Sequence, residues 1–228
     1  MDISPILISL KTASLSIVIT FFSGILAAYL VVNMKNGKLK AVIDGLLTLP
    51  LVLPPTVAGF FLLYIFGVQR PAGAFLLNFL GVKIVFTWGA TVLAAVVISF
   101  PLMYRSARGA FEQVDETLLY AARTIGMPEW KIFWRVLMPP ALPGIVSGCI
   151  LTFARGLGEF GATAMIAGNI AGKTRTLPLA IYSAVAGGNM DGAYEYVVIL
   201  AGIAFLAVVG INCLTVKERR CKGKGAAQ

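Results

Sequence analysis

The segment YAARTIGMPEWKIFWRVLMP, residues 120–139, is a polar, helix-forming insert with an internal glycine and a terminal proline. It stands between two apolar stretches, residues 84–104 and about 141–160. Since roughly 20 apolar residues in a helix cross a hydrocarbon core of about 30 Å, each stretch is long enough to span a membrane. We therefore expect a membrane protein that presents this insert to a soluble partner on one side.

The composition of the whole chain supports this class. Of its 228 residues, 58% are apolar and only 13% are charged, whereas soluble domains are about a quarter charged. Further apolar stretches lie at residues 13–32, 45–68 and 196–216. Because unpaired backbone groups are costly in lipid and no alternation of period two is visible, these stretches are expected to be helices. The sequence predicts an all-α, polytopic membrane protein with about five transmembrane helices in one domain, residues 1–228.

Basic residues are distributed unevenly among the segments that connect the apolar stretches. Most of the 19 lysine and arginine residues lie in residues 35–40, 105–135 and 217–224, which an alternating topology places on one side of the membrane. The positive-inside rule makes that side the cytoplasm, so the N-terminus is expected outside and the C-terminus inside. The net charge of +9 then requires no nucleic-acid partner, and the basic tail is expected beside anionic lipid. Asp2 is the only charged residue before Lys11, so the first apolar stretch lacks the basic N-terminal region of a removable signal peptide. This stretch is therefore expected to remain as a helix.

The first half of the loop at about 105–140 predicts a helix that ends at a glycine. Over residues 112–125, Leu118, Ala122 and Ile125 fall on one helical face. Gly126 is expected to end the helix, because glycine adopts the left-handed conformation at little cost.

The second half of the loop predicts an amphipathic helix. Pro128 suits its first turn, and Pro139 and Pro140 are expected to stop it. Its apolar face repeats at helical spacing and consists of Trp130, Phe133, Trp134 and Leu137. Two interpretations stay open: a helix that lies on lipid, and a docking element for a cytoplasmic protein.

This loop resembles the signature loop of permease subunits of binding-protein-dependent ATP-binding cassette (ABC) importers. That signature is Glu-Ala-Ala, three residues, glycine, nine residues, then an aliphatic, any residue, an aliphatic and proline. The matching residues here are Ala121, Ala122, Gly126, Val136, Met138 and Pro139, and Tyr120 stands where the family usually has glutamate. The resemblance implies a coupling helix that docks in a cleft of the ATPase subunit, with Tyr120, Ala121, Ala122, Gly126, Trp130 and Pro139 as coupling residues.

Two other segments narrow the resemblance. LPLVLPPTVAG (residues 49–59) and FARGLGEFGATAMIAGN (residues 153–169) are similar to permeases for tetrahedral oxyanions, above all molybdate permeases. Sulfate or thiosulfate permeases and tungstate permeases are the alternatives within the family. A stand-alone channel or a secondary transporter is the alternative from another class, although we find neither inverted repeats nor midplane acidic residues.

Prolines interrupt the predicted span 45–68. Pro50, Pro54 and Pro55 lack backbone donors and clash with preceding carbonyl groups, so this span is expected to break or kink. Broken membrane helices are tolerated where they line a cavity or pack on protein. Pro54, Pro55 and Thr56 are therefore candidates for the border of the anion path, with a simple packing kink as the alternative.

Arg155 and Glu159 are ionisable residues deep in the predicted span 141–160. They are four residues apart and share one helix face. Ionisable residues at such depth are functional candidates. They either neutralise each other and fix helix packing, or join neighbouring subunits at an outer gate.

No catalytic or metal site is expected in the chain. It has no histidine, and its three cysteines have no metal-ligand spacing. AGNIAGKT (residues 167–174) lacks the first glycine of a phosphate-binding loop and is expected on the outer side, so nucleotide binding is not expected. Residues 176–190 are apolar but too short for a crossing, and are expected to form a re-entrant or outer helix.

The resemblance implies the remaining partners. Five helices enclose too little for a gated path, so two copies are expected to pair. Two cytoplasmic ATP-binding subunits would bind ATP and Mg²⁺, this chain would hold no cofactor, and a binding protein outside would deliver the oxyanion. The expected location is the inner, cytoplasmic membrane, in contact with its lipid.

Overall fold

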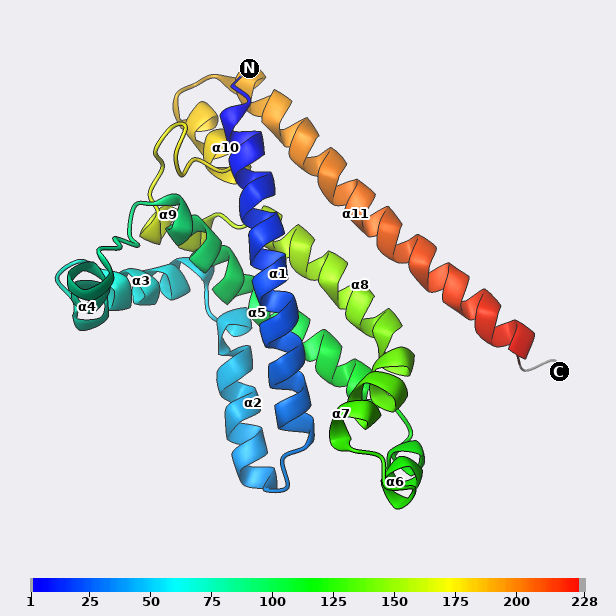
Figure 1. Cartoon of the computed structure of the whole chain (residues 1–228). Helices are drawn as coiled ribbons and strands as arrows, with labels where there is room; N and C mark the ends of the chain where they lie inside the picture. Colours follow the sequence, from blue (N-terminus) through cyan, green and yellow to red (C-terminus); the bar gives the residue numbers. More distant parts are fainter. Residues whose placement is uncertain (1, 226–228) are drawn as a thin grey trace.

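The computed structural model describes residues 2–225, with side-chain surroundings for all of these except residue 80 and residues 211–225. Within that range every regular element is a helix (Figure 1). The core consists of three long helices, α1 (Ser4–Val32), α5 (Trp88–Glu112) and α8 (Met138–Leu157), and α5 packs along both of the others. Four helices are long and apolar enough to cross a membrane, or five if a bent pair counts as one span. The all-α, polytopic fold predicted from the sequence is confirmed.

Small residues allow the core helices to approach closely. Ala94 and Ala107 of α5 are completely buried. Gly148 of α8 lies so near α5 that a Cβ atom added to it would be 2.3 Å from Cβ of Ser106. Gly144 lies one turn earlier, and a Cβ atom added to it would be 2.9 Å from Cβ of Ala110. Because lipid tails are as apolar as leucine, close packing of small residues is a main source of helix association in membranes.

The predicted span 45–68 does not cross the bundle as one straight helix. It is divided into α2 (Gly37–Val52) and α3 (Pro55–Phe66), which are bent by 110°. The break lies at Leu53, whose backbone is extended (ψ 139°), the conformation that a following proline favours. Pro55 then occupies the first turn of α3, where a backbone amide would have no hydrogen-bond acceptor within the helix. Pro50 was also expected to disturb this span, but α2 continues through it.

The other elements lie around the core. α4 (Pro71–Leu80) and α9 (Gly161–Ile166) are short, and α3 packs on both. α10 (Leu177–Ala186), in the segment expected to be too short for a crossing, is a single short helix near the N-terminus at the upper end of the molecule in Figure 1. α11 (Met190–Gly225) runs from that end and diverges from the bundle, so its apolar part is only 6% buried.

The loop at residues 105–140 differs in detail from expectation. α5 extends to Glu112, so the helix expected over residues 112–125 begins only at Glu116, as α6 (Glu116–Thr124). The second helix starts as α7 (Glu129–Ile132), passes through one π-helical turn, η1 (Phe133–Leu137), and continues directly into α8.

Pro139 and Pro140 therefore do not stop the second helix, and that prediction was wrong. They occupy the first turn of α8. The amide of Met138 donates to the carbonyl of Phe133, five residues earlier. This wider turn takes up the two prolines without ending the helix, because it displaces the carbonyl groups that would otherwise meet their rings.

The close contact of α5 and α8 generates a stability prediction. Gly148→Ala should destabilise the bundle by about 1–3 kcal/mol, the usual cost of overpacking, because its new methyl group would collide with Ser106. Thermal unfolding of the purified protein, followed by tryptophan fluorescence, should show a lower midpoint. The double variant Gly148→Ala/Ser106→Gly should recover most of the loss.

Gly202→Ala is the matched control, because a Cβ atom there meets nothing within 4 Å. It should leave the midpoint unchanged or raise it slightly. Equal midpoints for Gly148→Ala and Gly202→Ala would contradict the proposed role of this contact.

Candidate functional site

A sharp, well-defined corner separates α6 from α7. The backbone of Gly126 is left-handed, with φ +80°, as expected from the sequence. The Gly126 amide donates to the carbonyl of Arg123 at 2.9 Å, and the Met127 amide donates to the carbonyl of Ala122 at 3.1 Å. These two bonds form a Schellman motif, which satisfies the last carbonyl groups of α6 and fixes the exit direction of the chain.

Polar contacts hold both ends of α6. At the start, the Asp115 carboxylate accepts a bond from the Thr117 amide at 2.8 Å, and this bond holds the pKa of Asp115 below its usual range. At the corner, Arg123 forms a two-pronged ion pair with Glu129 of α7, at 2.8 and 3.2 Å. Both side chains are substantially exposed, so the pair contributes little stability. Its fork geometry instead fixes the angle between α6 and α7.

α6 exposes apolar side chains at the tip of the molecule. Of the three residues expected on its apolar face, only Ala122 is buried. Leu118 is 51% exposed and Ile125 is 80% exposed, and the neighbouring Tyr120 is 59% exposed. Figure 1 shows α6 as the lowest element, away from the long helices. A short helix that displays large apolar side chains beyond the bundle has the character of a docking surface for another protein.

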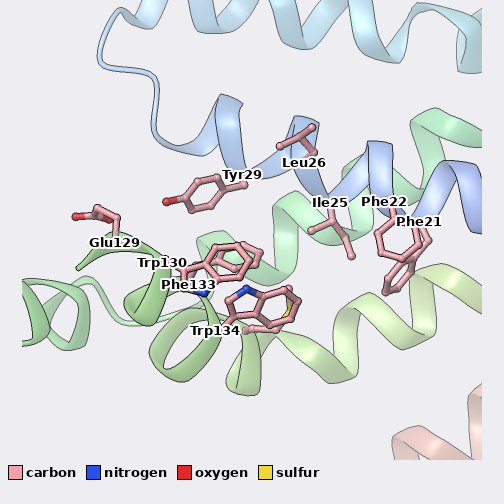
Figure 2. A pocket seen from close by; sticks show the side chains of 10 residues that line it. Phe21, Phe22, Ile25, Leu26, Tyr29, Glu129, Trp130, Phe133 and Trp134 are labelled. Carbon is pink, nitrogen blue, oxygen red and sulfur yellow. The ribbon is translucent and has the colours of Figure 1, made fainter. Parts of the chain in front are cut away.

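The aromatic residues of α7 and η1 face a different neighbour. Trp130, Phe133 and Trp134 lie against α1 and line a groove with it (Figure 2). Phe133 contacts Tyr29 of α1 edge to face, with ring centres 4.9 Å apart. Leu137, the last member of the predicted apolar face, is buried in the core between the long helices.

The two segments that resemble oxyanion permeases meet in the structure, at the crossing of α3 and α9. A Cβ atom added to Gly161 would lie 3.0 Å from Cβ of Pro55 and 3.1 Å from the amide of Thr56. One added to Gly59 would lie 2.6 Å from Cα of Ala162. The N-terminal ends of α3 and α9 therefore touch, although about 100 residues separate them in the chain. Pro54 and Thr56 are exposed beside this crossing.

Glu159 and Arg155 stand next to the same crossing. The Glu159 side chain is 2% exposed, and its two oxygens have different partners. One accepts a bond from Arg155 at 2.8 Å, and the other accepts a bond from the Ala162 amide at 2.8 Å, which caps α9. Within one chain the two residues thus pair with each other, and they fix the turn between α8 and α9.

A polar network that the sequence did not indicate ties α2 to α5. The Asp44 carboxylate accepts a bond from the hydroxyl of the fully buried Tyr104 at 2.9 Å and forms an ion pair with Arg108. Arg108 also pairs with Glu112 at 2.8 Å, and Lys40 approaches the same carboxylate at 3.7 Å. About 60 residues separate Asp44 from its partners. The only signal in the sequence was the position of Asp44, an acidic residue directly before the predicted span 45–68.

The segment AGNIAGKT forms a compact loop rather than a phosphate cradle. The Ile170 amide donates to the hydroxyl of the buried Thr174 at 3.0 Å. In a phosphate-binding loop the hydroxyl at the position of Thr174 would bind Mg²⁺, whereas here it accepts this bond from within the loop. In the described part of the chain, no group of three His, Cys, Asp or Glu side chains is arranged to hold a metal ion.

These features define a class of protein: a multi-pass helical membrane protein with a helix pair broken at proline and a short helix that exposes apolar side chains at one end. The family described as binding-protein-dependent transport system inner membrane component matches residues 20–215. The chain belongs to this family.

Curated relatives support the assignment. The "Molybdenum transport system permease protein ModB" of Escherichia coli (strain K12) is 42% identical over 205 residues, which cover 90% of this chain and 89% of the relative. The "Probable sulfate transport system permease protein cysT" of Chlorokybus atmophyticus is 33% identical over 210 residues, which cover 92% of this chain and 73% of the relative.

Solved structures share the fold. An inward-facing structure of the MetNI methionine ABC transporter matches with a TM-score of 0.67 and 18% identity, over 92% of this chain and 94% of that chain. A bacterial ABC transporter involved in the import of the acidic polysaccharide alginate matches with a TM-score of 0.73 and 16% identity, over 94% of this chain and 79% of that chain.

The turn between α8 and α9 leads to a prediction about Glu159. Glu159→Gln keeps an oxygen that can cap α9 but removes the charge that pairs with Arg155. We expect uptake by the assembled transport system to fall several-fold, because Arg155 is left without its partner at the crossing of α3 and α9. Uptake and ATP hydrolysis in proteoliposomes measure the effect.

The control is Glu195→Gln, the same change at an exposed position of α11, which should behave like the unchanged protein. If uptake and ATP hydrolysis are unaltered in Glu159→Gln, this pair has only a packing role.

Proposed function

We propose that this chain is the permease subunit of an ABC importer that carries a tetrahedral oxyanion, molybdate, across the inner membrane. The observation that carries the proposal is the 42% identity, over 90% of this chain, to a molybdenum transport permease. A relative named for sulfate transport is 33% identical, so sulfate is the second candidate. Tungstate, which has the charge and shape of molybdate, is the third.

In this proposal α6 docks with an ATP-binding subunit. Tyr120, Ala121, Ala122 and Gly126 lie in α6 or at its corner, and the exposed Leu118 and Ile125 widen the apolar contact surface. Tyr120 replaces the glutamate that is usual in the family, so we assign the docking to shape and apolar contact rather than to a carboxylate. The other two expected coupling residues lie further along the loop: Trp130 is in α7, and Pro139 is in the first turn of α8.

The proposed anion path passes the crossing of α3 and α9. The start of α3 is formed by Pro54, Pro55 and Thr56. The helix dipole places a partial positive charge at this N-terminal end, which favours an anion. Arg155 is partly exposed beside it. A divalent oxyanion in bare hydrocarbon would be very costly, so the path requires a polar wall of this kind. Two copies of the chain pair to enclose it, and the poorly buried α11 is available for contact with lipid or the second copy.

The orientation completes the proposal. The N-terminus and α10 face the outside, where a binding protein delivers the anion, and α6 and the C-terminus face the cytoplasm. The distribution of lysine and arginine supports this orientation. ATP and Mg²⁺ bind to the two partner ATPase subunits, and this chain performs no chemistry of its own.

Reconstitution tests the proposed substrate. The complex of this permease with its ATPase and binding protein, in proteoliposomes, should hydrolyse ATP faster when molybdate is added than when sulfate is added at equal concentration. Greater stimulation by sulfate or tungstate would transfer the assignment to that anion. Loss of all stimulation when the permease is omitted is the control.

The docking role of α6 predicts the effect of a change at its corner. Gly126→Trp should leave the protein in the membrane but uncouple it, because a side chain at φ +80° is strained by about 1–2 kcal/mol and turns α6 away from its present direction. Uptake should fall strongly, and less ATPase should co-purify.

Gly188→Trp is the matched control. Gly188 has φ +74°, ends α10 with the same Schellman pattern of hydrogen bonds, and lies at the opposite end of the molecule from α6. It should keep normal ATPase co-purification. Normal uptake and normal co-purification in Gly126→Trp would refute the docking role.

A further inference from the structure

An apolar groove runs between α1 and the stem of the loop, α7 and η1. It has a volume of about 360 Å³. Phe22 and Leu26 of α1 form one wall, and Trp130 and Trp134 form the other. The aromatic rings meet edge to face, with ring centres 5.6 Å apart for the two tryptophans.

The two ends of the groove differ in polarity. Figure 2 shows Phe21 and Phe22 at one end and the Tyr29 hydroxyl and the Glu129 carboxylate at the other. The helix rises about 1.5 Å per residue, so the eight steps from Phe21 to Tyr29 span about 12 Å along α1. The groove is thus an elongated space, parallel to a membrane-spanning helix, with an apolar end beside Phe21 and Phe22 and a polar end near the C-terminus of α1.

The outer surface of α1 beside the groove is suited to lipid. α1 is a candidate membrane span with a mean hydropathy of 2.4. Phe22 is 67% exposed, Leu26 is 59% exposed and Leu30 is 54% exposed. Trp130 and Trp134 lie near the end of this span, where tryptophan and tyrosine gather at membrane interfaces.

Such a groove does not stay empty in a bilayer. Water gains few hydrogen bonds from its walls, because their polar groups are confined to the indole nitrogens, the Tyr29 hydroxyl and Glu129. An empty groove would forgo the dispersion contacts of two aromatic walls. We infer that the groove binds one acyl chain of a phospholipid, with the headgroup at the Tyr29 and Glu129 end.

Basic residues belong to or follow the helices that form the groove. Lys35 follows α1, and Lys131 and Arg135 belong to α7 and η1; all three are exposed. They outnumber the single acidic residue that lines the groove, Glu129, which is already paired with Arg123. Phosphate is common to all phospholipid headgroups, and these cations provide it with partners.

The bound chain would connect the bilayer to the docking helix. The stem that forms one wall of the groove also carries the Gly126 corner and α6. An acyl chain packed between α1 and the stem would hold the stem in place, so lipid would stabilise the geometry that α6 presents. This inference concerns the lipid-facing wall of the chain and does not depend on which anion is transported.

Lipid retention tests the inference directly. After mild solubilisation of the full-length protein from phosphatidylcholine nanodiscs, native mass spectrometry should find one phospholipid retained per chain. Leu26→Trp, which fills the groove from an exposed position, should retain none. Leu30→Trp makes the same change one turn further along α1, outside the lining of the groove, and should retain the lipid. No retention in the unchanged protein, or equal retention in both variants, overturns the inference.

Fluorescence provides a second measurement that does not depend on a groove variant. The chain has three tryptophans, so Trp88→Phe leaves Trp130 and Trp134 as the reporters. Phosphatidylcholine with brominated acyl chains should quench both, and quenching should persist when the ATPase subunit is bound. Absence of quenching, or its loss when the ATPase binds, would show that protein rather than lipid occupies the groove and would refute the inference.

Discussion

The close contact between α5 and α8 is the constraint on which the rest of the structure depends. α5 packs against α1, α2, α8 and α9, so its position sets theirs. In a membrane this packing cannot rely on the exclusion of water, because lipid is as apolar as the side chains. Gly144 and Gly148 bring the backbone of α8 close to Ala110 and Ser106 instead. The turn that Glu159 caps follows directly from α8, and the loop stem leads directly into it, so both candidate sites are fixed to this one contact.

Prolines illustrate what the sequence could predict about the fold and what it could not. The break at Leu53 was predictable, because proline disfavours the helical conformation of the residue before it, and two prolines follow Leu53 in succession. The continuation of the chain through Pro139 and Pro140 was not, because it depends on a π-helical turn just before them. Both segments contain two successive prolines, Pro54-Pro55 and Pro139-Pro140. What differs is whether the preceding turn can widen, and that is decided by packing of Phe133 and Leu137 on the core.

The candidate sites show a similar division. Local features were visible in the sequence: the left-handed Gly126 corner, and the spacing that pairs Arg155 with Glu159. Contacts between distant segments were not. The bond between Tyr104 and Asp44 and the crossing of Thr56 with Gly161 each join residues far apart in the chain. A helical pattern gives the face of a residue but not the helix that the face meets, so the division of Leu118, Ala122 and Ile125 between exposed and buried positions also required the structure.

The loop at residues 105–140 carries two separate apolar surfaces, one on α6 and one on α7 and η1. α6 places large apolar side chains at the tip of the molecule, where the proposed ATPase subunit would cover them. α7 and η1 place theirs against α1, where they line the apolar groove. Between them stand the Gly126 corner and the Arg123 pair with Glu129. A force applied to α6 must pass through this corner to reach α8, and a flexible corner would dissipate it. The corner is therefore built from a Schellman motif and a forked ion pair, two arrangements that fix direction while adding little to overall stability.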